Sequence, residues 1–379
     1  MAINRNVYQL LMQDGYTVEL VVPESLNFPS GRKTAETRRA TDPVLHYLAL
    51  KGDNPRTYYF EGLEKILNEY RPSVVLLDND PVSRLALATG QWCQKNKAKL
   101  FCISCENLPL TISSALQRRG VKNIPAAIVK RFLLYKTRKV IDGVFTLNSD
   151  GKKIFTEEGF GLVEKMPLGY DPAYFYSDAA AGQIIKQQLG LNKKVIAYFG
   201  RLTREKGVHI LIQALAGLQE KEWVLMMDKF DAYASPYKAE VQALLTKAAI
   251  LDRVIFISPT HYEIAAYMNA ADIVVVPSVS AAHWKEQYGR VAAEAMACGV
   301  KLIASDSGAL PELLNNFGWL FEEGNVEAIR QLLKGFLEGT IEEGHRTPDA
   351  IAAYAKSELS IVKQKAIMQS AFEKAMHLN

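Results

Sequence analysis

Short apolar runs alternate with helical patterns along almost the whole chain, and this alternation constrains the fold more than any other feature. A first series of strand-like runs comprises Tyr16–Val22, Ser73–Leu77, Leu100–Ser104 and Val144–Leu147. A second series comprises Val195–Phe199, Trp223–Met227, Val254–Ser258, Ile273–Val276 and Lys301–Ala304. Helical stretches such as Val208–Leu218 and Ser235–Ala249 lie between the runs. Strands that alternate with helices predict βαβ units and mostly parallel sheets.

Two such series predict two doubly wound α/β domains, which suits 379 residues at ~150 residues per domain. The turn-rich segment Met166–Pro172 is the predicted hinge. We therefore expect an N-terminal domain over residues 1–172 and a C-terminal domain over residues 173–359. A doubly wound domain usually opens with a strand, whereas this chain opens with a helical pattern at Asn4–Gln13. The first strand is therefore predicted to be missing, either because the start is truncated or because this lineage dispenses with it.

Composition narrows the class of protein. Hydrophobic residues make up 49% and charged residues 23%, which is ordinary for a globular protein. No apolar run approaches the ~20 residues of a membrane-spanning helix, and the N-terminus lacks a basic-then-apolar signal peptide. The four cysteines are too few and too unevenly spaced for a disulfide framework. We expect a cytoplasmic protein in a reducing compartment.

Positive charge is concentrated between Asn107 and Ile141. This segment contains no acidic residue, and apolar residues are interleaved with its basic ones. The basic residues are Arg118, Arg119, Lys122, Lys130, Arg131, Lys136, Arg138 and Lys139. A basic amphipathic stretch favours contact with an anionic membrane surface or an anionic substrate, although a solvated helix face packed on a core gives the same pattern. No nucleic-acid-binding motif is present.

The run Val195–Phe199 leads into a glycine and a polar loop that carries cations. Gly200 is followed by Arg201, Arg204 and Lys206 before the next helix begins. Ligands of α/β folds bind at the carboxyl ends of parallel strands. An arginine fork and a lysine ammonium at that edge would neutralise a diphosphate.

A second informative segment holds two glutamates eight residues apart. Glu286 is predicted on a loop, and a short alanine-rich helix is predicted from Arg290 to Cys298, ending at Gly299. The N-terminus of that helix, around 289–291, offers free N–H groups and a positive dipole end for a phosphate. Glu294 on the helix would accept hydrogen bonds from vicinal hydroxyls such as those of a ribose.

These segments resemble the donor-site signature of retaining GT-B glycosyltransferases of the family-4 type, also called glycosyl transferases group 1. The likeness is collinear over residues 195–325 and includes the stretches 270–278 and 305–312. It extends more moderately over residues 140–175. The resemblance implies a GT-B fold, in which two Rossmann-like domains face a central cleft and a C-terminal helix at about 360–379 packs back on the N-terminal domain.

The same resemblance implies roles for individual residues. Arg201 and Lys206 would bind the donor diphosphate, Glu286 the hydroxyls of the donor sugar, and Glu294 the ribose. The implied catalytic residues are Glu286, Lys206 and Arg201. The implied donor-binding set is completed by Gly200, Ser258, Pro259, Tyr288, Gly289, Arg290 and Val291. The donor would be a UDP- or GDP-type sugar, with no metal and no other cofactor.

The implied reaction moves a hexose, with retention, to the hydroxyl of a glycan or lipid-linked acceptor in cell-surface polysaccharide synthesis. Such an enzyme would be cytoplasmic or peripheral on the inner face of the cell membrane. The N-terminal domain would bind the acceptor, but it lacks the family's glycine-rich loop, and the histidine common after one of its strands is not evident. Its candidate acceptor-side residues are Asn79, Asp80, Glu106 and Asn107. The family's Gly-Asp-Gly-like turn is replaced by residues 227–230.

Two other functions stay open. The chain could be a non-catalytic sugar-nucleotide-binding or scaffold protein with a degenerate N-terminal domain, which the missing first strand favours. It could also be a metal-dependent GT-A transferase, because Asp78 and Asp80 follow an apolar strand as a metal-binding Asp-x-Asp pair does.

Overall fold

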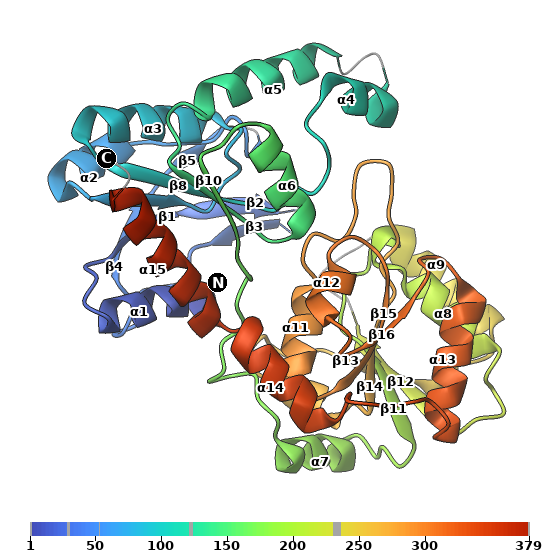
Figure 1. Cartoon of the computed structure of the whole chain (residues 1–379). Helices are drawn as coiled ribbons and strands as arrows, with labels where there is room; N and C mark the ends of the chain where they lie inside the picture. Colours follow the sequence, from blue (N-terminus) through green and yellow to red (C-terminus); the bar gives the residue numbers. More distant parts are fainter. Residues whose placement is uncertain (1, 29–30, 53, 121–123, 230–235, 378–379) are drawn as a thin grey trace. The chain divides into compact units, whose positions relative to one another are not determined.

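The computed structural model describes residues 2–28, 31–52, 54–120, 124–229 and 236–377, which divide into two compact units (Figure 1). Unit 1 comprises residues 1–169 and 361–379, and unit 2 comprises residues 170–360. The division falls inside the turn-rich segment Met166–Pro172. Within the described ranges, no helix combines the length and apolar character needed to cross a membrane.

Unit 2 is a single six-stranded parallel sheet with helices on both faces. Its strands are β11 (Lys194–Tyr198), β12 (Trp223–Asp228), β13 (Val254–Ile257), β14 (Ile273–Val276), β15 (Lys301–Ser305) and β16 (Trp319–Phe321). Its helices are α7 (Ala179–Gln188), η3 (Arg204–Lys206), α8 (Val208–Ala216), α9 (Pro236–Lys247), η4 (Leu251–Arg253), α10 (Ile264–Ala270), α11 (Arg290–Ala297), α12 (Leu310–Leu314), α13 (Val326–Glu338) and α14 (Pro348–Glu358). Helices α8, α9 and α13 lie along one face, and α7, α11 and α14 along the other (Figure 1).

The strand order of unit 2 fixes where a ligand would bind. The order is β13-β12-β11-β14-β15-β16, which is 3-2-1-4-5-6 in order of appearance. The topological switch point of such a sheet lies between its first and fourth strands, here β11 and β14. All four residues of β14 are buried β-branched side chains, as expected for a central strand covered on both faces.

Unit 1 contains two parallel sheets and two small hairpins. Its strands are β1 (Glu19–Pro23), β2 (Ser25–Phe28), β3 (Gly31–Thr34), β4 (Val44–Leu48), β5 (Leu50–Lys51), β6 (Tyr59–Phe60), β7 (Val74–Leu77), β8 (Lys99–Ser104), β9 (Gly143–Thr146) and β10 (Leu162–Lys165). Its helices are η1 (Ala2–Arg5), α1 (Asn6–Gln13), α2 (Leu63–Tyr70), α3 (Arg84–Asn96), α4 (Ile112–Arg119), α5 (Ile124–Thr137), α6 (Ser149–Glu157) and α15 (Ile361–His377). The sheets are β1-β4 and β10-β9-β8-β7, and β2-β3 and β5-β6 pair antiparallel.

Helix α15 returns the end of the described chain to unit 1. The Phe372 ring packs edge-on against Phe101 of β8 and Phe145 of β9, with centroids 4.9 and 6.1 Å apart. Lys365 and Gln369 reach Asp14 after α1 at 2.5 and 2.9 Å. This helix therefore links α1 to the four-stranded sheet.

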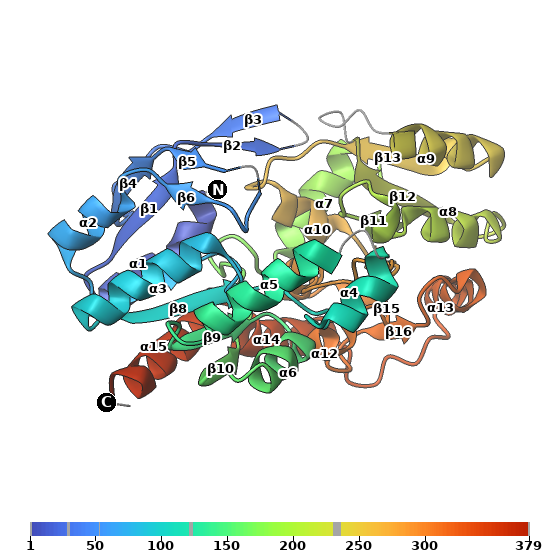
Figure 2. The ribbon, with the colours of Figure 1, turned by 90° about the horizontal axis from the view of Figure 1, so that it is seen from above.

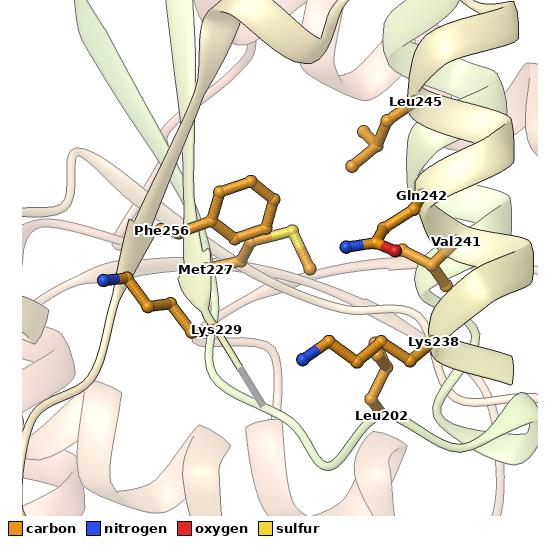
Figure 3. Close-up of a pocket in the computed structure, with 8 residues that line it drawn as sticks. All are labelled: Leu202, Met227, Lys229, Lys238, Val241, Gln242, Leu245 and Phe256. Carbon is orange, nitrogen blue, oxygen red and sulfur yellow. The ribbon is translucent and has the colours of Figure 1, made fainter. Parts of the chain in front are cut away.

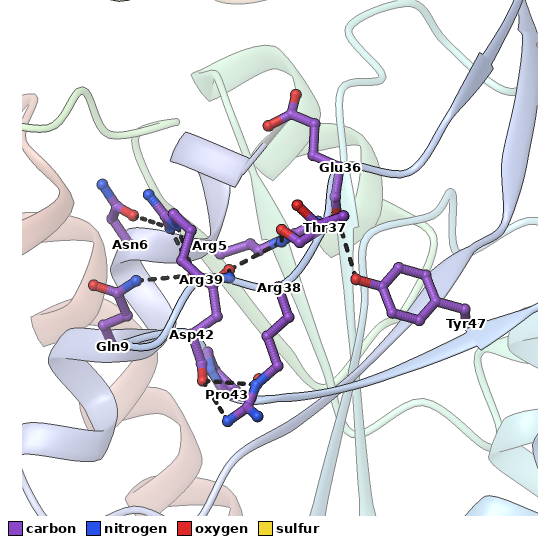
Figure 4. Close-up of polar contacts among 10 residues, drawn as sticks. All are labelled: Arg5, Asn6, Gln9, Glu36, Thr37, Arg38, Arg39, Asp42, Pro43 and Tyr47. Carbon is purple, nitrogen blue, oxygen red and sulfur yellow. Dashed lines mark hydrogen bonds and ion pairs between the residues drawn. The ribbon is translucent and has the colours of Figure 1, made fainter.

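A buried carboxylate holds the segment before β4 against α1 (Figure 4). The Asp42 side chain is fully buried and pairs with Arg5 at 2.9 Å and Arg39 at 2.7 Å. Gln9 donates to its Oδ1 at 3.0 Å. Burial alone would raise the pKa of Asp42, but the hydrogen bonds from Arg39, Arg5 and Gln9 hold that pKa well below its ordinary value. Asp42 is therefore a structural anion, because its oxygens are occupied by protein donors.

Most predicted elements differ from the structure only at their ends. The predicted run Tyr16–Val22 corresponds to β1, which begins three residues later at Glu19, and the opening helix Asn4–Gln13 divides into η1 and α1. Ser235, the predicted start of the helix that becomes α9, lies outside the described residues. The two hairpins and the strands β4, β10 and β16 were not predicted.

Candidate active site

Two loops meet at the switch point of unit 2. One follows β11 and contains the turn η3, and the other follows β14. The Val279 amide donates to the Glu205 carbonyl at 2.8 Å and joins them. Gly207 follows η3 with φ +69°, and a Cβ there would lie 1.7 Å from the Pro277 carbonyl oxygen. Glycine is therefore required where the two backbones approach each other.

This approach brings a lysine and a glutamate together across 80 residues of sequence. Lys206 Nζ lies 2.5 Å from Glu286 Oε2. The buried Ser278 hydroxyl donates to the same oxygen at 2.8 Å. The Glu286 side chain is 7% exposed and the Lys206 side chain 18%. The pair is therefore a largely desolvated, charge-assisted contact.

The loop that follows β15 holds the backbone around Glu286 in place. The Ala309 amide donates to the Glu286 carbonyl at 3.0 Å. Gly308 has φ +55°, and a Cβ there would lie 2.0 Å from the Glu286 carbonyl oxygen. On the other side, the Trp284 ring covers the Lys206 ammonium at 5.0 Å from its centroid.

A pocket of about 310 Å³ opens at the ends of β11, β12 and β13. It is lined by Phe199, Gly200, Arg201, Asp228, Pro259, Thr260, His261, Ile264, Met268, Val291 and Glu294. The helix α11 begins at this pocket with Gly289 as its N-cap residue. The pocket therefore combines the first turn of a helix, an arginine and two carboxylates.

One of the two carboxylates that line this pocket, that of Glu294, is buried. Glu294 is only 5% exposed, and its Oε1 accepts from Arg290 Nε at 3.0 Å. Burial raises the pKa of Glu294, and the adjacent Arg290 guanidinium offsets only part of that rise. A buried carboxylate with one side-chain donor is suited to accepting hydrogen bonds from a hydroxyl-bearing ligand.

A smaller pocket of about 180 Å³ lies between α9 and the strands β12 and β13 (Figure 3). Its walls are largely apolar, with Leu245 and Val241 on the helix side and Phe256 and Met227 on the strand side. None of the residues that line it belongs to the site predicted from sequence. Among the described residues, no cluster of histidine, cysteine, aspartate or glutamate side chains is arranged to hold a metal ion.

Residues 182–357 match the model of the family described as Glycosyl transferases group 1. The matched residues lie within unit 2 and make up most of it. A D-inositol 3-phosphate glycosyltransferase of Xylanimonas cellulosilytica is 34% identical over 35% of this chain and 31% of its own length. A lipopolysaccharide core biosynthesis mannosyltransferase of Rhizobium meliloti is 29% identical over 49% of this chain and 52% of its own length. The chain thus spans between about a third and a half of the length of these curated relatives.

The fold of the chain is also found among solved structures. Sucrose-phosphate synthase from Thermosynechococcus elongatus superposes with a TM-score of 0.68 and 18% identity, covering 99% of this chain and 93% of that one. The chain therefore has the predicted GT-B fold. This fold disfavours the alternative of a GT-A transferase built on Asp78 and Asp80.

Within unit 2, the structure gathers most of the predicted donor-site residues in two places. Gly200, Arg201, Pro259, Val291 and Glu294 line the larger pocket, and Lys206 and Glu286 form the ion pair. The other predicted residues are close in sequence to residues that line the pocket but do not line it themselves. Ser258 is exposed and does not line it, Tyr288 is buried, Gly289 is the N-cap of α11, and Arg290 binds Glu294.

Several residues of the site were not predicted from sequence. Ser278 lies two residues after the end of β14, so its place near a strand end was the signal that could have revealed it. Asp228, Thr260 and His261 line the pocket from the ends of β12 and β13. Asp228 lies in the turn that replaces the family's Gly-Asp-Gly-like turn, and Phe230 of that turn lies outside the described residues.

The predicted acceptor-side residues lie in unit 1 at the carboxyl ends of β7 and β8. Glu106 pairs with Lys130 of α5 at 3.2 Å, and Asn107 is buried. Asp80 Oδ1 accepts from the Val82 amide at 2.8 Å. Asn79 instead donates to the Pro55 carbonyl at 3.4 Å. These residues share one sheet edge, and Lys130 of the predicted basic segment joins them from α5.

Proposed function

We propose that the chain is a glycosyltransferase that moves a hexose from a nucleotide-diphosphate sugar to an acceptor hydroxyl, with retention and without a metal. The observation that carries the proposal is the Lys206–Glu286 ion pair beside a pocket that Glu294 lines. A cation, a carboxylate, a helix N-terminus and a second, buried carboxylate lie at the switch point, where α/β sheets bind nucleotides.

The chemistry follows from the charge that develops on the leaving group. As the bond to the sugar breaks, negative charge grows on the departing diphosphate. Arg201 and Lys206 supply positive charge for it, and the first turn of α11 supplies N–H groups, all in place before the reaction begins. Lys206 is held by Glu286 until a diphosphate competes for its ammonium, and Glu286 then remains to hold hydroxyls of the sugar.

The remaining roles extend the same proposal. Glu294 would bind the ribose, and the backbone at the end of β13 would line the base of a UDP- or GDP-type donor. The acceptor would be a glycan or lipid-linked hydroxyl held by unit 1 near Asp80 and Glu106. One relative named above is a mannosyltransferase of lipopolysaccharide core biosynthesis, which supports a role in the synthesis of surface glycans or glycolipids.

The first test is nucleotide binding and turnover without added metal. Thermal-shift titrations with UDP, GDP and ADP and their sugar conjugates, in the presence of a chelator, should give a saturable shift with one nucleotide. Release of nucleoside diphosphate from the matching donor, with water as acceptor, then reports turnover. Binding of a donor with no turnover over all acceptors tried would favour the non-catalytic alternative.

The decisive variant is Lys206→Ala. It should slow nucleotide release about a hundredfold or more, the order found when one group that stabilises transition-state charge is removed. Lys247→Ala, on the exposed end of α9, is the matched control and should behave as wild type. A Lys206→Ala protein with the wild-type rate would end this proposal.

A further inference from the structure

Helix α5 turns an apolar stripe outward. Ile128, Val129, Phe132 and Tyr135 are 53, 64, 62 and 46% exposed. Their spacing of one, three and three residues places them on one face of the helix. A surface helix of a globular protein normally packs such a stripe against its core. Here the stripe is uncovered in the part of the chain that the structure describes.

The orientation of α5 is fixed by its other face. Leu134 and Thr137 are buried in unit 1. Arg131 pairs with Glu158 at 2.5 Å, and Lys130 pairs with Glu106 at 3.2 Å. The helix therefore cannot turn its stripe inward without breaking two ion pairs and uncovering core residues. Figure 1 shows α5 along the top of unit 1, and in Figure 2, which looks from above, the helix lies in front of the sheet.

The neighbouring helix α4 adds to the same surface. Ile112 and Leu116, one turn apart, are 41 and 39% exposed, and α4 packs against α5. We call the exposed side chains of both helices the α4–α5 surface; its apolar members are Ile112, Leu116, Ile128, Val129, Phe132 and Tyr135.

Cations lie among these apolar side chains. Lys136 is 5.4 Å from the Phe132 ring centroid, and Lys139 and Arg138 are 4.3 and 4.9 Å from that of Tyr135. In the described ranges, no carboxylate pairs with Lys136 or Lys139. Lys122 lies outside the described residues, as does the side chain of Arg119. Since residues 107–141 contain no acidic residue, the surface is both apolar and positively charged.

We propose that the α4–α5 surface binds an anionic phospholipid bilayer, with the apolar stripe inserted at the headgroup boundary and the lysines among the lipid phosphates. Interfacial helices combine apolar and aromatic residues with lysine and arginine in this way. A second copy of the chain would set like charges against each other, so charge complementarity favours the bilayer. A nucleic acid would leave Val129 and Phe132 uncovered.

The α4–α5 surface also indicates which class of acceptor the protein uses. This step rests on the proposed function. Lys130 lies on α5 between the stripe and Glu106 at the end of β8. The acceptor-side residues would then lie about one helix diameter, ~10 Å, from the lipid headgroups. The acceptor class that fits is a hydroxyl on a membrane lipid, whose chains stay in the bilayer while its headgroup reaches unit 1.

Vesicle co-sedimentation of the whole chain tests the proposal without any substrate. The protein should sediment with vesicles of equimolar phosphatidylglycerol and phosphatidylcholine, and much less with phosphatidylcholine alone. Added salt should release it, because screening weakens the lysine contribution. The double variant Val129→Ser/Phe132→Ser should lower the partition coefficient at least about tenfold. Lys136→Gln and Lys139→Gln should each lower it about fivefold at low salt.

Matched controls come from equally exposed apolar residues on other helices. Ile184 of α7 and Val362 of α15 are each 53% exposed, so Ile184→Ser and Val362→Ser should sediment as wild type. Failure of the wild-type chain to bind anionic vesicles would overturn the proposal, as would a double variant that binds like wild type. A dimer that the double variant dissociates would assign the surface to a second copy instead. Nucleotide binding, measured in parallel, reports separately on the function proposed for unit 2.

Discussion

At the scale of single residues, Glu294 links burial to ligand binding. Its carboxylate is almost fully buried, and burial raises its pKa above the ordinary value of 4.5. The ionised form accepts hydrogen bonds from two hydroxyls, whereas the protonated form loses part of that capacity and the attraction to Arg290. Affinity for a nucleotide that binds here should therefore depend on the protonation of this group.

We expect nucleotide affinity to fall as the pH decreases through a window above 4.5, where Glu294 takes up a proton. Folding stability changes in the opposite sense. The folded state holds this proton more tightly than the unfolded chain, so the contribution of Glu294 to stability improves as the pH falls through that window. A loss of nucleotide affinity caused by protonation of Glu294 can therefore be distinguished from unfolding of the protein at low pH. Calorimetric titrations across the pH range measure the first, and urea denaturation measures the second.

The variant Glu294→Gln tests whether Glu294 causes the pH dependence of nucleotide affinity. It should bind the nucleotide more weakly at neutral pH and lose most of the pH dependence, because its amide does not titrate. Arg201→Gln should weaken binding while keeping the dependence, since Arg201 lines the pocket without being the titrating group. If Glu294→Gln retains the wild-type pH profile, another group controls binding.

At the scale of elements, loops position the residues of the site, and close backbone contacts hold these loops in place. Glu286 lies on a loop without regular structure, and its position depends on the contact with Gly308. An alanine at 308 would adopt an unfavourable positive φ and also place its Cβ within 2.0 Å of the Glu286 carbonyl oxygen. That overlap can be relieved only by moving one of the two loops.

Gly308→Ala should therefore reduce turnover more than it reduces stability. We expect at least about a tenfold loss of nucleotide release, because displacement of about 1 Å at a catalytic group commonly costs more than that. Gly324→Ala is the matched control: its φ is +79°, and nothing lies within 4 Å of its Cβ. It carries the same conformational cost without the overlap. Equal activity of the two variants would show that Gly308 does not position Glu286.

The elements also show what the sequence could and could not predict. Runs such as Ile273–Val276 were predicted to the residue because buried β-branched stretches are strong strand signals. The hairpin of β2 (Ser25–Phe28) and β3 (Gly31–Thr34) was missed because its polar residues give no apolar run. Spacing placed Glu286 on a loop, but its pairing with Lys206 depends on strand order. The concentration of positive charge in residues 107–141 could be predicted from the sequence. The outward orientation of the apolar stripe on α5 could not, because it depends on how the helix packs on unit 1.

At the scale of the whole molecule, the two units differ in how their sheets are completed. Unit 2 has the full order 3-2-1-4-5-6. Unit 1 has β4-β1 and β7-β8-β9-β10 as separate parallel sheets. The same order, lengthened by one strand at the β10 edge, leaves these two sheets when its first strand is absent. Correspondingly, β1 and β7 are only half-buried at every position, whereas every residue of β9 is buried. Among the described residues, no strand joins β1 to β7, so other contacts must hold these two sheets together.

Helix α15 supplies such contacts, because it packs on α1 and also covers Phe101 and Phe145 of the four-stranded sheet. Deletion of residues 361–379 should therefore expose those rings and unfold unit 1, since a large buried aromatic contributes about 3–5 kcal/mol. Unit 2 has its own core, so it should stay folded and keep its nucleotide affinity. Hydrogen exchange resolved by peptide, together with nucleotide titration, measures the two effects in one preparation. Full protection of β8 and β9 in the shortened chain would show that unit 1 is held together without α15, and loss of nucleotide binding would show that the units do not fold independently.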